Sequence, residues 1–170
     1  MESGDPGAWT ANWVWGLPLI VLNAVIHVLG LGLINERVVR TLSSVMDHRH
    51  FTSMFAVAMS VTVLLATLLH GIEAAVWATA YRFLGALPDN KTAMLYSLSA
   101  LTSYGHANIS LADHWRMMGA LEALNGMLLF GLTTAFLFAM IQQVWPLGSR
   151  DRRPTSSRDI RPRSANDRVP

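Results

Sequence analysis

Four ionisable side chains could form an intramembrane metal or proton site, because they stand inside or beside long apolar stretches: His27, His70, Glu73 and His106. His70 and Glu73 are three residues apart, so they lie on one face of a helix. Ionisable groups inside a membrane are costly and are usually partnered. One interpretation is a His70–Glu73 pair that only fixes its helix to its neighbours. The other is a site that binds a metal ion or a proton.

Signatures of enzymatic chemistry are missing from the sequence. Neither H-E-x-x-H nor G-x-S-x-G occurs, and these are the motifs that would indicate an intramembrane protease. The sequence holds 0 cysteines, which excludes disulfides, thiolate metal sites and cysteine nucleophiles. We therefore expect a protein without enzymatic activity, without a cofactor and without a bound metal as part of its site.

Three apolar stretches are long enough to cross a membrane. Residues 9–35 contain no charged residue, residues 51–81 contain only Glu73, and residues 117–145 contain only Glu122. A helix of about 20 apolar residues spans the ~30 Å of hydrocarbon in a bilayer. Charged residues make up 14% of the chain, against about 25% in soluble domains. The sequence thus predicts an all-α integral membrane protein with three transmembrane helices.

Turn residues and apolar periodicity set the expected bounds of the elements. Residues 92–102 are too short to cross, but their apolar residues recur at helical spacing, which predicts a half-depth helix. Pro146 and Gly148 predict the end of the last helix. The expected order is an N-terminal segment with the first span (1–35), a basic loop (36–50), a second helix (51–83), the short helix (92–102), an irregular loop (103–114), a third long helix (115–145) and a tail (147–170).

The distribution of Lys and Arg predicts the orientation in the membrane. Residues 36–50 hold three and residues 147–170 hold seven of the 13 basic residues. Basic loops stay on the cytoplasmic side, so we expect the C-terminus inside and the N-terminus outside the cell membrane. The tail is rich in Pro, Ser and charge, which predicts disorder. Its arginines could contact anionic lipid headgroups, and they are no argument for nucleic-acid binding.

The stretch 92–135 resembles the pore region of the potassium-channel family, in which a pore helix leads into a selectivity filter and an inner helix. The matching segments are Ala93–Leu98, Thr102-Ser103, Trp115-Arg116, Gly126 and Phe130–Ala135. The motif H-x-x-E-x-x-x-W, here His70, Glu73 and Trp77, is similar to that of small bacterial three-span channel proteins. The resemblance covers about residues 53–143, so it implies a pore domain at 51–146 with outer helix 51–83, pore helix 92–102, filter loop 103–114 and inner helix 115–145.

The resemblance also implies an assembly and a set of site residues. Family members are tetramers around the filter, so the expected partner is a second copy of this chain, and the expected permeant species is a monovalent cation, with K⁺ as the candidate. Gly126 would be a hinge, Glu122 would point toward the outer helix, and Glu73 would bond pore-helix groups such as Tyr96 or Ser99. The cavity would be lined by Met127, Phe130 and Thr134. The filter would be Thr102, Ser103, Tyr104, Gly105, His106, Ala107 and Asn108.

The outer half of this filter departs from the family pattern T-x-G-Y-G-D. Gly105 keeps the first glycine, but Ala107 replaces the second, and His106 and Asn108 replace the tyrosine and the aspartate. A left-handed conformation costs alanine ~1–2 kcal/mol, so we expect a rearranged outer filter and weak or altered K⁺ selectivity. His106 would either form a pH- or metal-sensitive ring or point away from the pore. A second register aligns Tyr104-Gly105 with the family's Y-G.

Two other functions are compatible with the sequence. The first is a non-conducting regulatory or structural membrane subunit, which keeps the pore fold without passing ions. The second is the intramembrane metal or proton site formed by the histidines and Glu73. The sequence contains no Arg-rich helix of the kind that forms a voltage sensor. Current through the reconstituted protein would distinguish a channel from a silent subunit, and stoichiometric metal would indicate the metal site.

Overall fold

The computed structural model describes residues 6–45, 51–105 and 108–149, and within these residues it is helical and contains no β-strand. Three helices are long and apolar enough to cross a membrane, over Gly7–Thr41, Thr52–Phe83 and Asp113–Gln143. The described part of the chain is therefore all-helical with three candidate membrane spans, as predicted. The elements are α1 (Pro6–Val45), α2 (Phe51–Phe83), α3 (Asn90–Leu101), the 3₁₀ helix η2 (Asp113–Trp115) and α4 (Arg116–Ser149).

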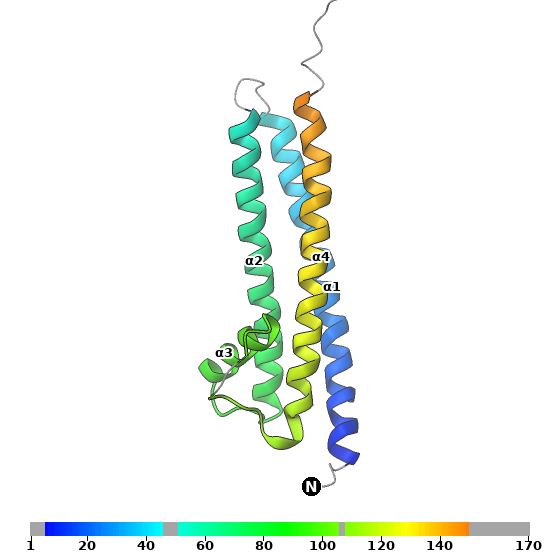
Figure 1. The fold of residues 1–170 in the computed structure, drawn as a ribbon, viewed down its shortest axis with the longest axis vertical. Coiled ribbons are helices and arrows are strands. Elements are labelled where there is room, and N and C mark those ends of the chain that lie inside the picture. Colours follow the sequence, from blue (N-terminus) through cyan, green and yellow to red (C-terminus); the bar gives the residue numbers. More distant parts are fainter. Residues whose placement is uncertain (1–5, 46–50, 106–107, 150–170) are drawn as a thin grey trace, which may run out of the picture.

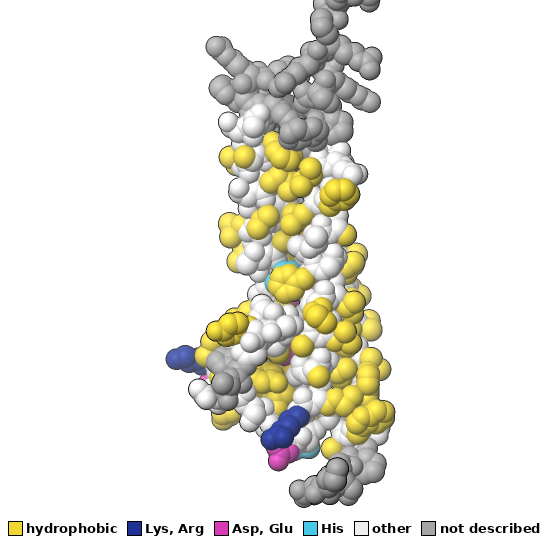
Figure 2. Space-filling model, viewed as in Figure 1, with side chains coloured by type: hydrophobic (Ala, Val, Ile, Leu, Met, Phe, Trp, Pro, Cys, Tyr) yellow, Lys and Arg dark blue, Asp and Glu magenta, His cyan; other side chains and the backbone are white. Residues whose placement is uncertain are grey.

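The three long helices form one elongated bundle, with α1 and α4 running in the same direction and α2 in the opposite one (Figure 1). The short helix α3 lies beside the bundle, near the end at which α1 begins, and packs against both α2 and α4. The apolar core is concentrated at this end, where Trp77, Tyr81, Ala93 and Met118 are each fully buried. Along the rest of the bundle, hydrophobic side chains are spread over the face seen in Figure 2. Such a surface suits lipid or neighbouring chains.

A single side chain of α1 ties this helix to the start of α4. Asn12 is buried, and its Nδ2 donates to the carbonyl oxygens of Ala8 (2.6 Å) and His114 (2.7 Å). Its Oδ1 accepts from the backbone N–H of Met118 at 3.0 Å. The first N–H groups of a helix have no partner within the helix. Asn12 therefore acts as a cap that α1 supplies to α4.

The predicted loop 36–50 is wrong for its first ten residues, because α1 continues as a helix to Val45. Neither Gly nor Pro interrupts residues 36–45. Glu36 and Arg40 form an ion pair one turn apart, and the Thr41 hydroxyl bonds the carbonyl of Arg37 at 2.9 Å. A charged helix can leave the hydrocarbon without unfolding, since its backbone stays bonded. The basic residues therefore did not mark the end of the helix.

The bounds of the other helices differ less from the prediction. α2 has the predicted bounds, 51–83. α4 continues through Pro146 to Ser149, beyond the predicted end at 145, because a proline in the last turn removes only one helix hydrogen bond. The first residues of the predicted tail are thus helical, and residues 150–170 lie outside the described residues.

Asp89 sets the start of α3 two residues earlier than predicted. This N-cap has an extended backbone (φ −148°), and its carboxylate accepts from the Thr92 N–H at 2.9 Å and from the Thr92 hydroxyl at 2.7 Å. These bonds hold the pKa of the Asp89 carboxyl below its ordinary value. On the α2 side, Arg82 bonds Asn90 Oδ1 at 3.0 Å and the Leu87 carbonyl at 2.6 Å. The turn between α2 and α3 is thereby fixed.

Candidate functional site

The segment predicted as the filter begins directly at the C-terminal end of α3. Ser103 and Gly105 both have left-handed backbones, with φ of 56° and 75°. The Ser103 N–H bonds the Ala100 carbonyl at 2.9 Å, and the Gly105 N–H bonds the Ser99 carbonyl at 3.2 Å. The sequence indicated the conformation of Gly105 but not that of Ser103, since serine pays ~1–2 kcal/mol for this geometry. His106 and Ala107 lie outside the described residues.

The described filter residues are open to the surroundings of a single chain. Thr102, Ser103, Gly105 and Asn108 are exposed, and the Tyr104 side chain is 86% exposed. Beside them, a hollow of about 410 Å³ is lined by Ser99, Ser103, Gly105 and Arg116, among others. Arg116 pairs with Asp113 at 2.7 Å. One copy of the chain therefore leaves this polar loop uncovered.

A buried carboxyl group fastens α3 to the bundle. Glu122 of α4 accepts from the Tyr81 hydroxyl of α2 at 2.7 Å and contacts the Ser97 hydroxyl of α3. Ser97 also lies 2.7 Å from the Ala74 carbonyl of α2. Glu122 thus points toward the outer helix, as predicted. The sequence did not indicate its partners, because Tyr81 and Ser97 carry no distinguishing spacing.

Two glycines of α4 allow α3 to approach its backbone closely. A Cβ at Gly126 would overlap the backbone carbonyl of Leu101, and a Cβ at Gly119 would overlap the Tyr96 hydroxyl. Burial, and secondly the nearby Glu122, raise the pKa of Tyr96 above its ordinary value, so its phenol is protonated at neutral pH. Gly126 was predicted as a hinge. The described helix is continuous there, and the absence of a side chain at Gly126 lets the Leu101 carbonyl pack against α4.

The three residues predicted to line a cavity lie on an open face of α4. Met127 is 59% exposed, Phe130 is 41% exposed, and Thr134 is exposed. The Thr134 hydroxyl bonds the Phe130 carbonyl at 2.9 Å, so it is satisfied within the helix. The Phe130 ring stacks on His70 with 4.3 Å between ring centroids. This face is available to another copy of the chain.

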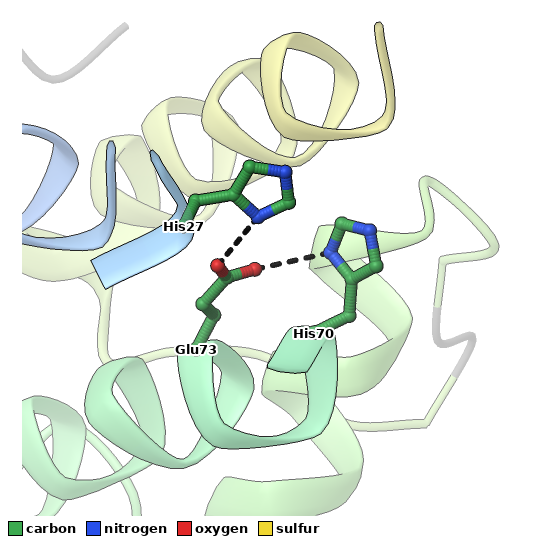
Figure 3. Close-up of side chains that lie close together, drawn as sticks. All are labelled: His27, His70 and Glu73. Atoms are coloured by element: carbon green, nitrogen blue, oxygen red, sulfur yellow. Dashed lines mark hydrogen bonds and ion pairs between the residues drawn. The ribbon is translucent and has the colours of Figure 1, made fainter. Parts of the chain in front are cut away.

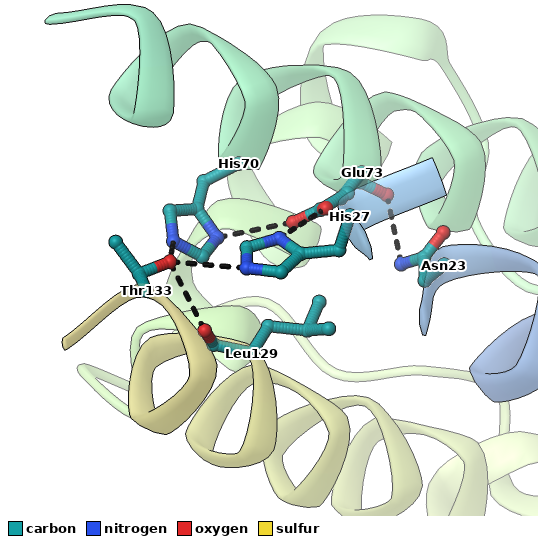
Figure 4. Close-up of polar contacts among 6 residues, drawn as sticks. All are labelled: Asn23, His27, His70, Glu73, Leu129 and Thr133. Atoms are coloured by element: carbon teal, nitrogen blue, oxygen red, sulfur yellow. Dashed lines mark hydrogen bonds and ion pairs between the residues drawn. The ribbon is translucent and has the colours of Figure 1, made fainter. Parts of the chain in front are cut away.

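A second buried polar cluster lies inside the bundle, where His27 of α1 meets His70 and Glu73 of α2 (Figure 3). The Glu73 carboxylate lies between the two imidazoles, with Oε1 2.7 Å from His27 Nδ1 and Oε2 3.0 Å from His70 Nδ1. On the far side of the rings, Thr133 Oγ1 of α4 lies 3.1 Å from both Nε2 atoms (Figure 4). Asn23 Nδ2 donates to the Glu73 carbonyl at 3.4 Å.

These contacts show whether Glu73 bonds the pore-helix groups that the resemblance implied or pairs with histidine. The expected bonds to Tyr96 or Ser99 are absent among the described contacts, since Tyr96 packs on Gly119 and the Ser99 hydroxyl bonds the Leu95 carbonyl at 2.8 Å. Glu73 instead pairs with the histidines. The sequence brought His70 and Glu73 together by their spacing, but it did not indicate that Thr133 would join them.

No protein family, no curated protein and no solved structure matches the chain. The similarity to potassium-channel pores therefore rests on the sequence motifs alone.

Proposed function

We propose that four copies of this chain form a cation pore of the potassium-channel type, in which Thr102–Asn108 lines the narrow part. The pore would pass monovalent cations with weak preference for K⁺, because His106, Ala107 and Asn108 replace the residues that build the outer carbonyl rings in that family. The N-terminus and the filter loop would face outside the cell membrane, and the basic C-terminal tail inside, where it would contact anionic lipid headgroups.

The depth of α3 carries the proposal. The Leu101 carbonyl lies against Gly126, ten residues after Arg116, where α4 begins. At 1.5 Å per residue this point is about 15 Å along α4, which is half of the ~30 Å of hydrocarbon. With the start of α4 at the membrane boundary, α3 would stop at half depth and would direct the negative end of its dipole toward the membrane centre. A cation at that end would be stabilised.

The conformation of the loop after α3 supports a row of carbonyls. Ser103 and Gly105 are alternate residues, and both have positive φ. In the family filter, alternate left-handed residues let successive carbonyls point the same way and replace the water around the ion. Ser103 accepts this conformation although it is not glycine, which suits a segment whose backbone geometry serves a purpose.

The proposal requires several copies, because one chain leaves the loop uncovered. Exposed backbone groups cannot face lipid without a large cost, and Thr102–Gly105 is exposed here. The open face of α4 with Met127 and Phe130 offers a surface on which copies can meet around an axis. Tetramers of the pore family bury such surfaces.

The test is current through the purified full-length protein in planar bilayers, together with its mass in detergent. We expect a tetramer and a cation current whose reversal potential in mixed K⁺ and Na⁺ shows weak discrimination. Replacing His106-Ala107-Asn108 with Tyr-Gly-Asp should raise K⁺ selectivity, since glycine restores the backbone freedom that alanine removes. A stable monomer or dimer, or no current with any cation, would refute the pore and leave a non-conducting subunit.

A further inference from the structure

We propose that His27, His70 and Glu73 form a binding site for a divalent transition-metal ion of the Zn²⁺ class, with Thr133 positioning the two imidazoles. One ligand atom from each of the three residues lies within 4.8 Å of the others, and all three residues are buried. Two come from α2 and one from α1 (Figure 3). The proposal does not depend on conduction and would hold for a silent subunit as well.

The hydrogen count at Thr133 fixes the tautomers of both rings. The single hydroxyl of Thr133 lies 3.1 Å from three atoms, which are His27 Nε2, His70 Nε2 and the carbonyl oxygen of Leu129 (Figure 4). A carbonyl oxygen only accepts, so the hydroxyl hydrogen goes to Leu129. The hydroxyl oxygen then accepts from both rings. Each imidazole therefore carries its hydrogen on Nε2.

This assignment leaves the other edge of each ring in need of a positive charge. With hydrogen on Nε2, a neutral imidazole presents a lone pair at Nδ1. Both Nδ1 atoms face a carboxylate oxygen, at 2.7 Å for His27 and 3.0 Å for His70. Two acceptors at such distances repel each other unless a cation lies between them. The candidates are one metal ion or two protons, each lying between one Nδ1 and the carboxylate oxygen that it faces.

A metal ion satisfies these atoms better than two protons do. Both choices give the cluster the same net charge, since a divalent ion replaces two protons. Two protonated rings would be two cations with centroids 5.1 Å apart in a buried site, and like charges at that separation repel strongly in a low dielectric. A metal ion held by His27, His70 and Glu73 would instead bring both positive charges to one carboxylate and would leave both imidazoles neutral.

The donor set indicates the class of metal. Two imidazole nitrogens and a carboxylate suit Zn²⁺ and its neighbours in the first transition row, whereas Mg²⁺ and Ca²⁺ prefer oxygen alone. The Nε2–H bonds to Thr133 correspond to the outer-shell bonds that orient metal-binding histidines. Because the donors come from α1 and α2 and the orienting hydroxyl from α4, the ion would hold the first helix to the other two.

The direct test is metal content and binding in the full-length protein, purified without a histidine tag. We expect roughly one zinc ion per chain by mass spectrometry. After chelation, added Co²⁺ should give the visible d–d absorption of a low-coordinate site. At a hundred-fold excess over Kd, Zn²⁺ should raise Tm by at least about 5 °C. Metal-free protein that gains neither absorption nor Tm would show that the cluster holds protons only, and would overturn the proposal.

Variants separate this site from other histidines. His27→Ala and His70→Ala should each weaken Co²⁺ binding by more than the about 10–100-fold expected for loss of an outer-shell partner, whereas His114→Ala, outside the cluster, should leave it unchanged. The double variant His48→Ala and His50→Ala should also leave Co²⁺ binding unchanged. These two residues lie outside the described residues. Retained binding in both cluster variants, or lost binding in the controls, would assign the metal to another place.

Thr133 tests the positioning role separately from the ligands. Thr133→Ala should weaken the metal about 10–100-fold, as removal of an outer-shell partner does, while Thr133→Ser keeps the hydroxyl and should restore most of the affinity. If both variants bind as the natural protein does, Thr133 does not orient the rings and the hydrogen count above fails.

Discussion

Glu73 and Glu122 are both fully buried in the helical bundle, yet they meet different partners. Glu73 lies between two imidazoles, with each Nδ1 atom facing one of its carboxylate oxygens. Imidazole nitrogen is a common ligand of metal ions. Glu122 meets two hydroxyl groups, from Tyr81 and Ser97. A carboxyl group among hydroxyls can be replaced by a neutral amide without losing its contacts. A carboxylate between imidazoles instead supplies the negative charge that balances a cation at the imidazoles, and a neutral amide cannot supply that charge.

The two glutamates therefore have different structural roles. The Glu122 group joins α3 to α2 and α4, and it stands where the pore proposal needs a firmly held short helix. The Glu73 group joins α1 to α2, and it stands where the metal proposal needs a negative charge. Substitutions that keep the shape and remove the charge should therefore separate them.

The largest effect is expected for Glu73→Gln. Glutamine has the same shape but no negative charge, so it cannot balance a cation bound beside the two Nδ1 atoms, and a buried charge pair loses one partner. We expect a loss of about 3–5 kcal/mol in the free energy of unfolding, measured by denaturant titration in detergent micelles. Equal losses for Glu73→Gln and Glu122→Gln would remove the distinction between the two groups.

A smaller effect is expected for Gly126→Ala, which tests how closely α3 must approach α4. The new Cβ would overlap the Leu101 carbonyl, and overpacking of this kind costs about 1–3 kcal/mol. The pore proposal adds that ion current should fall with it. Gly131→Ala on the same helix is the matched control, because a Cβ there meets nothing within 4 Å. If the control loses as much as Gly126→Ala, the close approach is not the cause.

Glu122→Gln should cost little, less than about 1 kcal/mol. The glutamine oxygen can accept from Tyr81, and its amide can donate to the Ser97 oxygen, whose own hydrogen then goes to the Ala74 carbonyl 2.7 Å away. Thermal unfolding of the two proteins side by side measures the difference. Unfolding of the variant under conditions in which the natural protein is stable would mean that the charge of Glu122 is needed.

Asp89 extends the comparison to an exposed carboxylate, and its effect should be the smallest. Its pKa is lowered in the folded protein, mainly by the Thr92 backbone N–H. Its contribution to stability is therefore complete above the unfolded pKa, about 4, and is lost as pH falls through the lower folded value. Asp89→Asn keeps the cap without the charge. The difference in Tm between the two proteins at pH 7 should thus vanish near pH 2, and a constant difference would contradict this.

The sequence predicted the long helices better than their surroundings. Apolar length alone determines that a helix can span, so α2 was placed at its observed bounds. Charged residues do not by themselves end a helix, and α1 accordingly continues into the predicted loop as far as Val45. The left-handed Ser103 escaped prediction because serine carries no signal for such a conformation.

The buried clusters were predicted only as far as local spacing reaches. His70 and Glu73 are neighbours on one helix, so their meeting followed from the sequence. Thr133 lies 63 residues from His70 and 106 from His27 along the chain. Contacts of this range depend on how α4 is rotated against α1 and α2, and a single sequence with one threonine among many polar residues does not specify that rotation.

The cap that Asn12 supplies to α4 has a consequence for biosynthesis. Asn12 leaves the ribosome well before its partners His114 and Met118, which follow 102 and 106 residues later. Until α4 is translated, Nδ2 can keep its bond to the Ala8 carbonyl, but Oδ1 would lack its partner in or near the hydrocarbon, which is unfavourable. The nascent α1 must therefore stay at the insertion machinery, or against another polar group, until α4 arrives. Early release of α1 into lipid would trap the chain before its fold is complete.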